Sequence, residues 1–194
     1  MKVVVFGASG KVGQKVVAEL LSRGHKVRAF IYDNSPFDEH KNIEVVSGNV
    51  KDLSSVEQAV KGQDAVISTL GSWGTQTKDI LSEGMKNIIP AMKESAVERI
   101  VSLTGADARY SKDQVTLIGK LIRPILKMVA PKILSDGEKH IELLENSGLG
   151  WTVVRSPVMN ERGVTSYRLD NKAALPWQTI NRNSVSKAIV DCVE

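Results

Sequence analysis

Residues 2–13 read K-V-V-V-F-G-A-S-G-K-V-G, an apolar run followed by three glycines at three-residue spacing. The run from Val3 to Phe6 has the continuous apolar character of a strand that is buried on both faces of a parallel sheet. Apolar residues then recur at helical spacing up to Leu21, and Arg23-Gly24 ends this pattern. The stretch therefore predicts a strand, a glycine turn and a helix in immediate succession.

The glycine turn predicts a site for a dinucleotide. The first backbone N–H groups of a helix have no partner within the helix, and the helix dipole adds positive charge there. A pyrophosphate fits such a place, and side chains in the turn would keep it out. Gly7, Gly10 and Gly13 give the spacing G-x-x-G-x-x-G, whereas the usual dinucleotide fingerprint is G-x-G-x-x-G. The alternative is a tight strand-to-helix turn that binds nothing.

Length and composition indicate an ordinary globular protein. The 194 residues fit a single domain, and 42% hydrophobic with 25% charged residues is typical of such domains. The net charge of +4 is mild and the basic residues are spread out, so we expect no nucleic-acid partner. The one cysteine, Cys192, fits a reducing cytosol. No apolar stretch reaches the roughly 18 residues of a membrane span, and Lys2 leads directly into the first strand rather than into a signal peptide. We therefore expect a cytoplasmic protein.

Further strands and helices alternate along the chain. We expect strands at residues 25–31, 43–46, 65–67, 99–103 and 151–154, a helix between Asp52 and Gly62, and helices at 77–95, 137–146 and 184–193. This alternation predicts an α/β fold, a Rossmann-like doubly wound parallel sheet of order 3-2-1-4-5-6 in a three-layer sandwich. The ligand crevice is then expected at the carboxyl ends of the first and fourth strands. The chain from Pro157 to the last helix is expected to be rich in loops.

One segment fits this scheme poorly, a helical excursion at about 110–135. Its part from Val115 to Leu134 interleaves apolar residues with four cations, and Pro124 and Pro131 break it into short helices. It lies after the fifth strand, on the side where the crevice should open. Three interpretations stay open: a helical excursion packed on the domain, a lid or substrate wall, and a helix for a dimer or a membrane surface.

Polar residues at the ends of the strands are candidates for cofactor binding. Asp33 stands 20 residues after Gly13, where a carboxylate accepts hydrogen bonds from ribose hydroxyls and favours NAD. Lys11 in the glycine turn favours NADP instead, because it can pair with the 2′-phosphate of that cofactor. Asn49 is placed to meet the adenine edge, with turn formation as the alternative for both Asn49 and Asp33. Thr69, Leu70 and Gly71 end the strand that borders the crevice.

The candidates for catalysis are fewer. Ser102 and Thr104 lie on and just after the fifth strand and face the same way. Either is a candidate to hydrogen-bond a carbonyl substrate, and the favoured alternative for each is a residue that merely ends a strand. None of the three tyrosines has a lysine four residues later, so the Y-x-x-x-K acid is not available. We interpret His140, between charged neighbours, as part of a solvated helix face. The histidines lack the spacing of metal ligands, and we expect no metal site.

These residues together resemble an atypical short-chain dehydrogenase/reductase of the NAD(P)-binding, NmrA-like subgroup, which includes the biliverdin-IXβ (flavin) reductases. The resemblance covers nearly the whole chain. It rests on residues 4–13 (V-V-F-G-A-S-G-K-V-G), 46–50 (V-S-G-N-V), 62–68 (G-Q-D-A-V-I-S), 82–89 (S-E-G-M-K-N-I-I) and 147–155 (S-G-L-G-W-T-V-V-R).

The resemblance implies a bound NADP or NAD, with NADP slightly favoured. The residues expected to contact it are Gly7, Ser9, Gly10, Lys11, Val12, Gly13, Tyr32, Asp33, Asn49, Val50, Thr69, Leu70, Gly71, Ser156, Pro157 and Val158. The nicotinamide is expected near Thr69–Gly71, Thr104 and residues 156–158.

Three departures from the family pattern bear on function. The family usually has Arg-Asp at the end of the second strand, where this chain has Tyr32-Asp33, so the arginine for the 2′-phosphate is missing. The family's Gly-Asp-Val is Gly48-Asn49-Val50 here. The flavin reductases have a serine after the threonine that follows the fifth strand, whereas Thr104 is followed by Gly105.

The function expected from these observations is an NAD(P)H-binding oxidoreductase that reduces a small carbonyl, quinone or flavin-like substrate. The alternative is a non-catalytic NAD(P)-binding redox sensor or regulator of the NmrA-like type. We expect a small-molecule substrate of unknown identity, and a monomer or homodimer.

Overall fold

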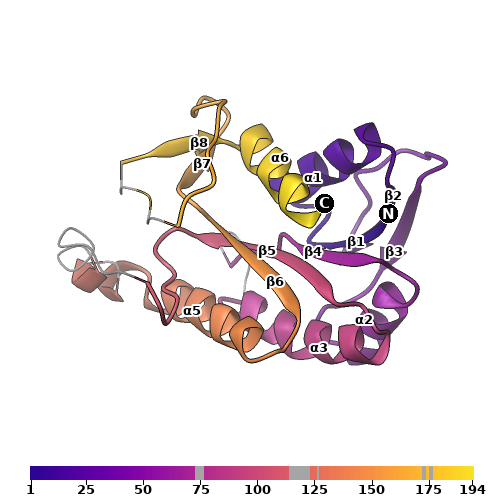
Figure 1. Ribbon diagram of the computed structural model, residues 1–194, viewed down its shortest axis with the longest axis horizontal. Coiled ribbons are helices and arrows are strands. Elements are labelled where there is room, and N and C mark those ends of the chain that lie inside the picture. Colours follow the sequence, from indigo (N-terminus) through magenta and orange to yellow (C-terminus); the bar gives the residue numbers. More distant parts are fainter. Residues whose placement is uncertain (73–76, 114–122, 126, 172–173, 175–176) are drawn as a thin grey trace.

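The computed structural model describes residues 1–72, 77–113, 123–125, 127–171, 174 and 177–194. Six parallel strands form the main sheet: β1 (Lys2–Phe6), β2 (Lys26–Ile31), β3 (Ile43–Ser47), β4 (Ala65–Ser68), β5 (Arg99–Gly105) and β6 (Gly150–Ser156). Their order is β3-β2-β1-β4-β5-β6 (Figure 1). The predicted fold class and strand order are confirmed, and β1 pairs with β2 on one side and β4 on the other.

Helices cover both faces of this sheet (Figure 1). One layer contains α1 (Lys11–Ser22) and α6 (Arg182–Val193), and the other contains α2 (Leu53–Val60), α3 (Ile80–Glu94) and α5 (Pro131–Glu145). Strand β1 supplies both cores, because successive side chains point to opposite faces of a sheet. Val3 and Val5 pack in the α1/α6 core, whereas Val4 and Phe6 pack in the other core. This double burial explains the continuous apolar run.

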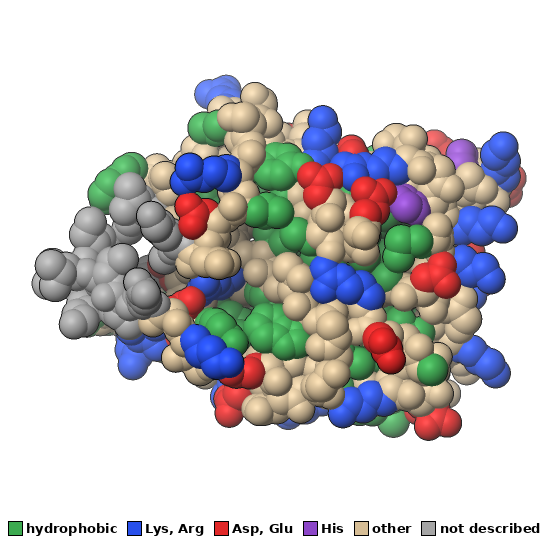
Figure 2. Space-filling view, viewed as in Figure 1, with side chains coloured by type: hydrophobic (Ala, Val, Ile, Leu, Met, Phe, Trp, Pro, Cys, Tyr) green, Lys and Arg blue, Asp and Glu red, His purple; other side chains and the backbone are tan. Residues whose placement is uncertain are grey.

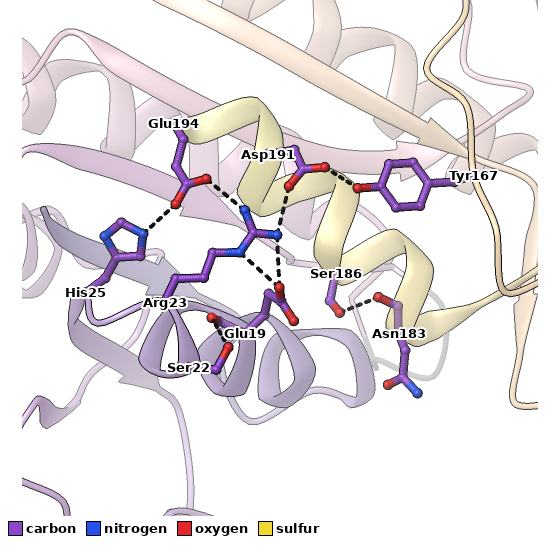
Figure 3. Close-up of polar contacts among 9 residues, drawn as sticks. All are labelled: Glu19, Ser22, Arg23, His25, Tyr167, Asn183, Ser186, Asp191 and Glu194. Atoms are coloured by element: carbon purple, nitrogen blue, oxygen red, sulfur yellow. Dashed lines mark hydrogen bonds and ion pairs between the residues drawn. The ribbon is translucent and has the colours of Figure 1, made fainter.

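Helix α6 is tied to α1 by a cluster of charges (Figure 3). The Arg23 guanidinium lies 2.9 Å from Glu19 and 2.7 Å from both Asp191 and Glu194. Glu194 also lies 2.8 Å from the Nε2 atom of His25. The cluster joins the last turns of two helices that are far apart in the sequence.

Several helices begin at other residues than the sequence predicts. Helix α3 begins at Ile80 rather than Thr77, and α6 begins at Arg182, where the Asn181 side chain accepts a hydrogen bond from the Asn183 N–H. Helix α5 begins at Pro131, six residues before the expected Gly137. Proline suits the first helical position, because its missing N–H has no partner there anyway.

The expectation of loops after Pro157 is wrong in part. Strands β7 (Val158–Asn160) and β8 (Thr179–Asn181) form a separate two-stranded parallel sheet. Each strand has only three residues, too few to produce a visible alternation in the sequence.

The predicted excursion at 110–135 falls partly outside the described residues. Its described part is helical at residues 123–125 and 127–129, followed by α5. The assignment of residues 1–194 to a single domain stays a prediction. Among the described residues, none of the helices combines the length and apolar character needed to traverse a bilayer.

Candidate functional site

The glycine turn lies where β1, β4 and α1 meet. Gly7 has a φ angle of +75°, and a Cβ atom there would lie 2.9 Å from the Leu70 nitrogen. A Cβ atom at Gly13 would lie 2.1 Å from the Gly7 carbonyl oxygen. These two glycines are therefore required for the close approach of the strands and the helix.

Gly10 has a different role, because it is exposed and forms the N-cap of α1. A Cβ atom on Gly10 would meet only the Gly7 carbonyl oxygen, at 3.2 Å. No side chain caps the helix, and the side chain of Gln14 donates to the Ser9 carbonyl oxygen at 2.7 Å, which stabilises the turn. An exposed helix start without a side-chain cap is an anion-binding geometry. These residues therefore fit the pyrophosphate of a dinucleotide.

The end of β4 is joined to this turn. The Thr69 hydroxyl donates to the carbonyl oxygens of Phe6 and Gly7, at 3.0 and 3.1 Å. The Thr69 side chain therefore stabilises the turn from behind. Leu70 packs toward α3, where a Cβ atom on Gly84 would lie 2.7 Å from it, and Gly71 is exposed with open space around it. The structure thus brings Thr69 and Leu70 to the glycine turn, and Gly71 follows them.

The end of β2 presents Tyr32 and Asp33 to solvent beside β1. Arg28, a possible cation for a 2′-phosphate by sequence, is engaged elsewhere. Its Nε atom lies 2.8 Å from Glu44, and its Nη1 atom donates to the carbonyl oxygens of Gln58, Ala59 and Lys61 at the end of α2. Lys11 is exposed at the first position of α1. Lys11 therefore remains the candidate cation from the sequence analysis.

Asn49 and Val50 follow β3 on the same edge of the sheet. The Asn49 side-chain oxygen accepts a hydrogen bond from the Lys51 N–H at 2.9 Å, which is the turn geometry weighed as the alternative. Val50 is buried and packs near Gly84. At the end of β6, Ser156 is buried, whereas Val158 is exposed. Ser156 and Val158, with Pro157 between them, lie on the far side of β5 from β4.

The two candidate catalytic residues lie under α5. Thr104 is 7% exposed, and a Cβ atom on Gly137 of α5 would lie 3.0 Å from its hydroxyl oxygen. Ser102 is completely buried, and its hydroxyl lies 2.7 Å from Nε2 of His140. The interpretation of His140 as part of a solvated face is wrong, because the ring packs against β5. Burial lowers the pKa of His140 to about 4, against a smaller opposing effect of Asp136.

Sequence reasoning did not single out Asp136, which organises the start of α3. This buried carboxylate accepts hydrogen bonds from the hydroxyls of Ser72 and Ser82, at 2.5 and 2.6 Å. It also accepts from the N–H groups of Leu81 and Ser82, at 3.1 and 2.8 Å. Asp136 and His140 stand eight and four residues before the buried Leu144. This spacing places both residues on the apolar face of the helix. It was the signal in the sequence that could have indicated their burial.

The comparisons with known proteins agree with this geometry. A family model described as NAD(P)H-binding matches residues 7–194, so the chain belongs to this family. The chain is 34% identical over 112 residues to a 3-beta-hydroxysteroid dehydrogenase of Mycolicibacterium neoaurum, which covers 52% of this chain and 31% of the relative. The chain thus spans less than a third of the length of that curated relative.

Solved structures share the fold. A short-chain dehydrogenase/reductase from Veillonella parvula in complex with NADP superposes with a TM-score of 0.77 at 20% identity, over 98% of this chain and 85% of that one. ChuY, titled an anaerobilin reductase from Escherichia coli O157:H7, gives a TM-score of 0.74 at 18% identity, over 98% and 89%. These superpositions show the fold that the resemblance to the short-chain dehydrogenases/reductases implies, and the family model confirms an NAD(P)H-binding family.

Proposed function

We propose that this chain is an NAD(P)H-dependent reductase of a small carbonyl, quinone or flavin-like substrate, with the cofactor lying across the carboxyl ends of β1 and β4. The observation that carries the proposal is the start of α1. Gly10 leaves it exposed and without a side-chain cap, at the point where the strand order of the sheet reverses. The names of the matched relatives, which are dehydrogenases and reductases, support the reaction class.

The cofactor supplies the hydride, and the protein binds, orients and shields it. In this proposal the glycine turn holds the pyrophosphate, and Thr69 keeps the turn in place through its two hydrogen bonds. Asp33 accepts hydrogen bonds from the ribose hydroxyls. Val158, which is exposed after β6, would cover the nicotinamide and exclude water. The proton comes from water or from the substrate itself.

The cofactor is NAD or NADP. The residues at the end of β2 favour neither cofactor strongly over the other. Asp33 repels a 2′-phosphate, and Arg28 is engaged with Glu44 and α2. Lys11 is the cation that offsets this repulsion. We therefore propose binding of both cofactors within about tenfold of each other.

A second function is favoured by the burial of Ser102 and Thr104. Neither hydroxyl reaches the surface to an extent that suits substrate contact, because α5 covers both. The second candidate is a redox sensor, which binds NAD(P)H without catalysis and changes partners as the cofactor is oxidised. The sensor needs the same glycine turn as the reductase.

Steady-state oxidation of NADH and NADPH separates the two functions. The panel contains a quinone, a free flavin and an aldehyde, each with cofactor at saturation. The reductase predicts turnover with at least one acceptor, and the KM for the cofactor should rise at least ~10-fold in a Gly10→Val variant that remains folded. Cofactor binding without turnover on any acceptor would favour the sensor.

A further inference from the structure

The positive charge of the chain is concentrated in one segment. Residues 114–135 contain Lys120, Arg123, Lys127 and Lys132 and no aspartate or glutamate. The whole chain has 26 basic and 22 acidic residues, so removal of these four leaves 22 of each. Figure 2 shows acidic and basic side chains interspersed over the part of this face that lies away from the grey residues. In the fold, the Arg123 guanidinium lies 2.7 Å from Glu138 of α5, so the positive charge that this segment presents in its described part is that of Lys127 and Lys132.

The described part of the segment also exposes large apolar side chains. Ile125, Met128 and Val129 are 56%, 78% and 74% exposed. Residues 123–125 and 127–129 are helical, and positions i, i+3 and i+4 of a helix lie on one face. Most soluble proteins bury such side chains, and an exposed apolar group beside cations marks an interaction surface.

Positive charge continues from this segment onto the neighbouring helices. Lys132 lines a groove of about 570 Å³ between the starts of α3 and α5, together with Lys78 and Lys139. Two carboxylates also line it. Asp136 is buried and accepts four hydrogen bonds, and Asp79 lies 3.4 Å from the Lys51 Nζ atom. Lys132 of the segment and Lys139 beside it therefore add positive charge here.

We propose that Ile125, Lys127, Met128, Val129 and Lys132, here called the basic apolar surface, dock on an anionic lipid membrane. Anionic headgroups attract lysines, and apolar side chains beside them enter the boundary between headgroups and acyl chains. The short helical stretch directly before α5 lies at the end of the molecule away from the chain termini (Figure 1), where it can meet a flat surface. A second copy of the chain is a poorer partner, because it presents the same positive charge.

Cosedimentation with lipid vesicles tests this surface. The vesicles contain phosphatidylcholine alone, or with about one third phosphatidylglycerol, at ~0.1 M salt. We expect the wild-type protein to pellet with the anionic vesicles and not with the neutral ones. Lys127→Glu, and the double variant Met128→Ser/Val129→Ser, should each lower the partition coefficient at least ~10-fold. These side chains are exposed, so circular dichroism and cofactor affinity should be unchanged.

Matched controls come from the opposite end of the sheet. Lys41→Glu makes the same change of charge, and Val45→Ser removes an exposed apolar side chain of β3. Both controls should bind vesicles as the wild type does. The proposal is overturned if the wild type stays in the supernatant with anionic vesicles, or if controls and variants lose binding equally. It is also overturned if none of these proteins binds vesicles and the double variant no longer self-associates in sedimentation velocity.

Discussion

The Nε2 atom of His140 lies 2.7 Å from the Ser102 hydroxyl oxygen, and both side chains are completely buried between α5 and β5. The lowered pKa of about 4 keeps the imidazole neutral at neutral pH. A neutral ring can accept the hydroxyl hydrogen at one nitrogen, which an imidazolium cannot do. The charge of the ring therefore decides the direction of this hydrogen bond, since a protonated Nε2 donates to the Ser102 oxygen instead of accepting from it.

Acid should destabilise the protein through His140. The folded protein keeps this ring neutral until about pH 4, whereas the unfolded chain binds the proton near its ordinary pKa of 6.5. The contribution of His140 to the free energy of unfolding is therefore fully present above pH 6.5. It is lost as the pH falls to 4, which lowers the free energy of unfolding by up to about 3 kcal/mol. Urea denaturation at several pH values measures this slope. His140→Gln should flatten it, and His40→Gln, at an exposed histidine, should not. Identical slopes in all three proteins would contradict this account.

Two helix caps should respond differently to the same substitution. Asp136 is buried and accepts four hydrogen bonds at the start of α3, whereas Asp52 is exposed at the N-cap of α2. Asp136→Asn turns an amide N–H₂ group toward donors and should cost about 3 kcal/mol. Asp52→Asn should cost under ~0.5 kcal/mol, because asparagine is a good N-cap. Chemical denaturation compares them, and equally small losses would refute the proposed role of Asp136.

The Arg23 cluster should hold α6 on α1 in a salt-dependent way. Arg23→Ala leaves Glu19, Asp191 and Glu194 without their shared cation, and should cost about 1–2 kcal/mol at low salt and less at ~0.5 M. Arg168 is the control, because its side chain is 84% exposed where it pairs with Asp170. Arg168→Ala should cost under ~0.5 kcal/mol. Thermal unfolding at two salt concentrations measures both, and a salt-independent loss for Arg23→Ala would argue against a charge effect.

The fold was predictable from the sequence because its signals are local. The run from Val3 to Phe6 and the glycine turn predict β1 and α1. The alternation of strand and helix patterns along the rest of the chain predicts the strand order of the sheet. The short strands β7 and β8 were missed because three residues are too few to show the alternation of apolar and polar residues that predicts a strand. Arg28 was ambiguous for another reason: its partners on β3 and α2 come together only in the folded chain.

The candidate site was predictable where backbone geometry decides it. Gly7, Gly13 and Thr69 come together as expected, because the turn and the end of β4 are adjacent in every such sheet. The contacts of Ser102 and Asp136 were not predictable, since they depend on how α5 packs against β5 and α3. His140 was misjudged because its charged sequence neighbours hid its place on the apolar face.

Selection between the two cofactors should depend on Lys11. This exposed lysine stands at the first position of α1, while Asp33 lies at the end of β2. Lys11→Ala should lower NADP affinity several-fold and leave NAD affinity nearly unchanged, because only NADP carries the 2′-phosphate. Dissociation constants for both cofactors, in wild type and variant, provide the measurement. An equal loss for both would show that Lys11 does not contact the 2′ position.

The central claim is that the glycine turn binds the pyrophosphate, and calorimetric titration of NADPH and NADH into the wild type and Gly10→Val tests it most directly. The branched side chain occupies the space before the exposed start of α1, so affinity for both cofactors should fall at least ~10-fold, about 1.4 kcal/mol. Gly150→Val, at the amino end of β6, is the control and should bind as the wild type does. Unchanged affinity in a folded Gly10→Val protein would contradict the claim.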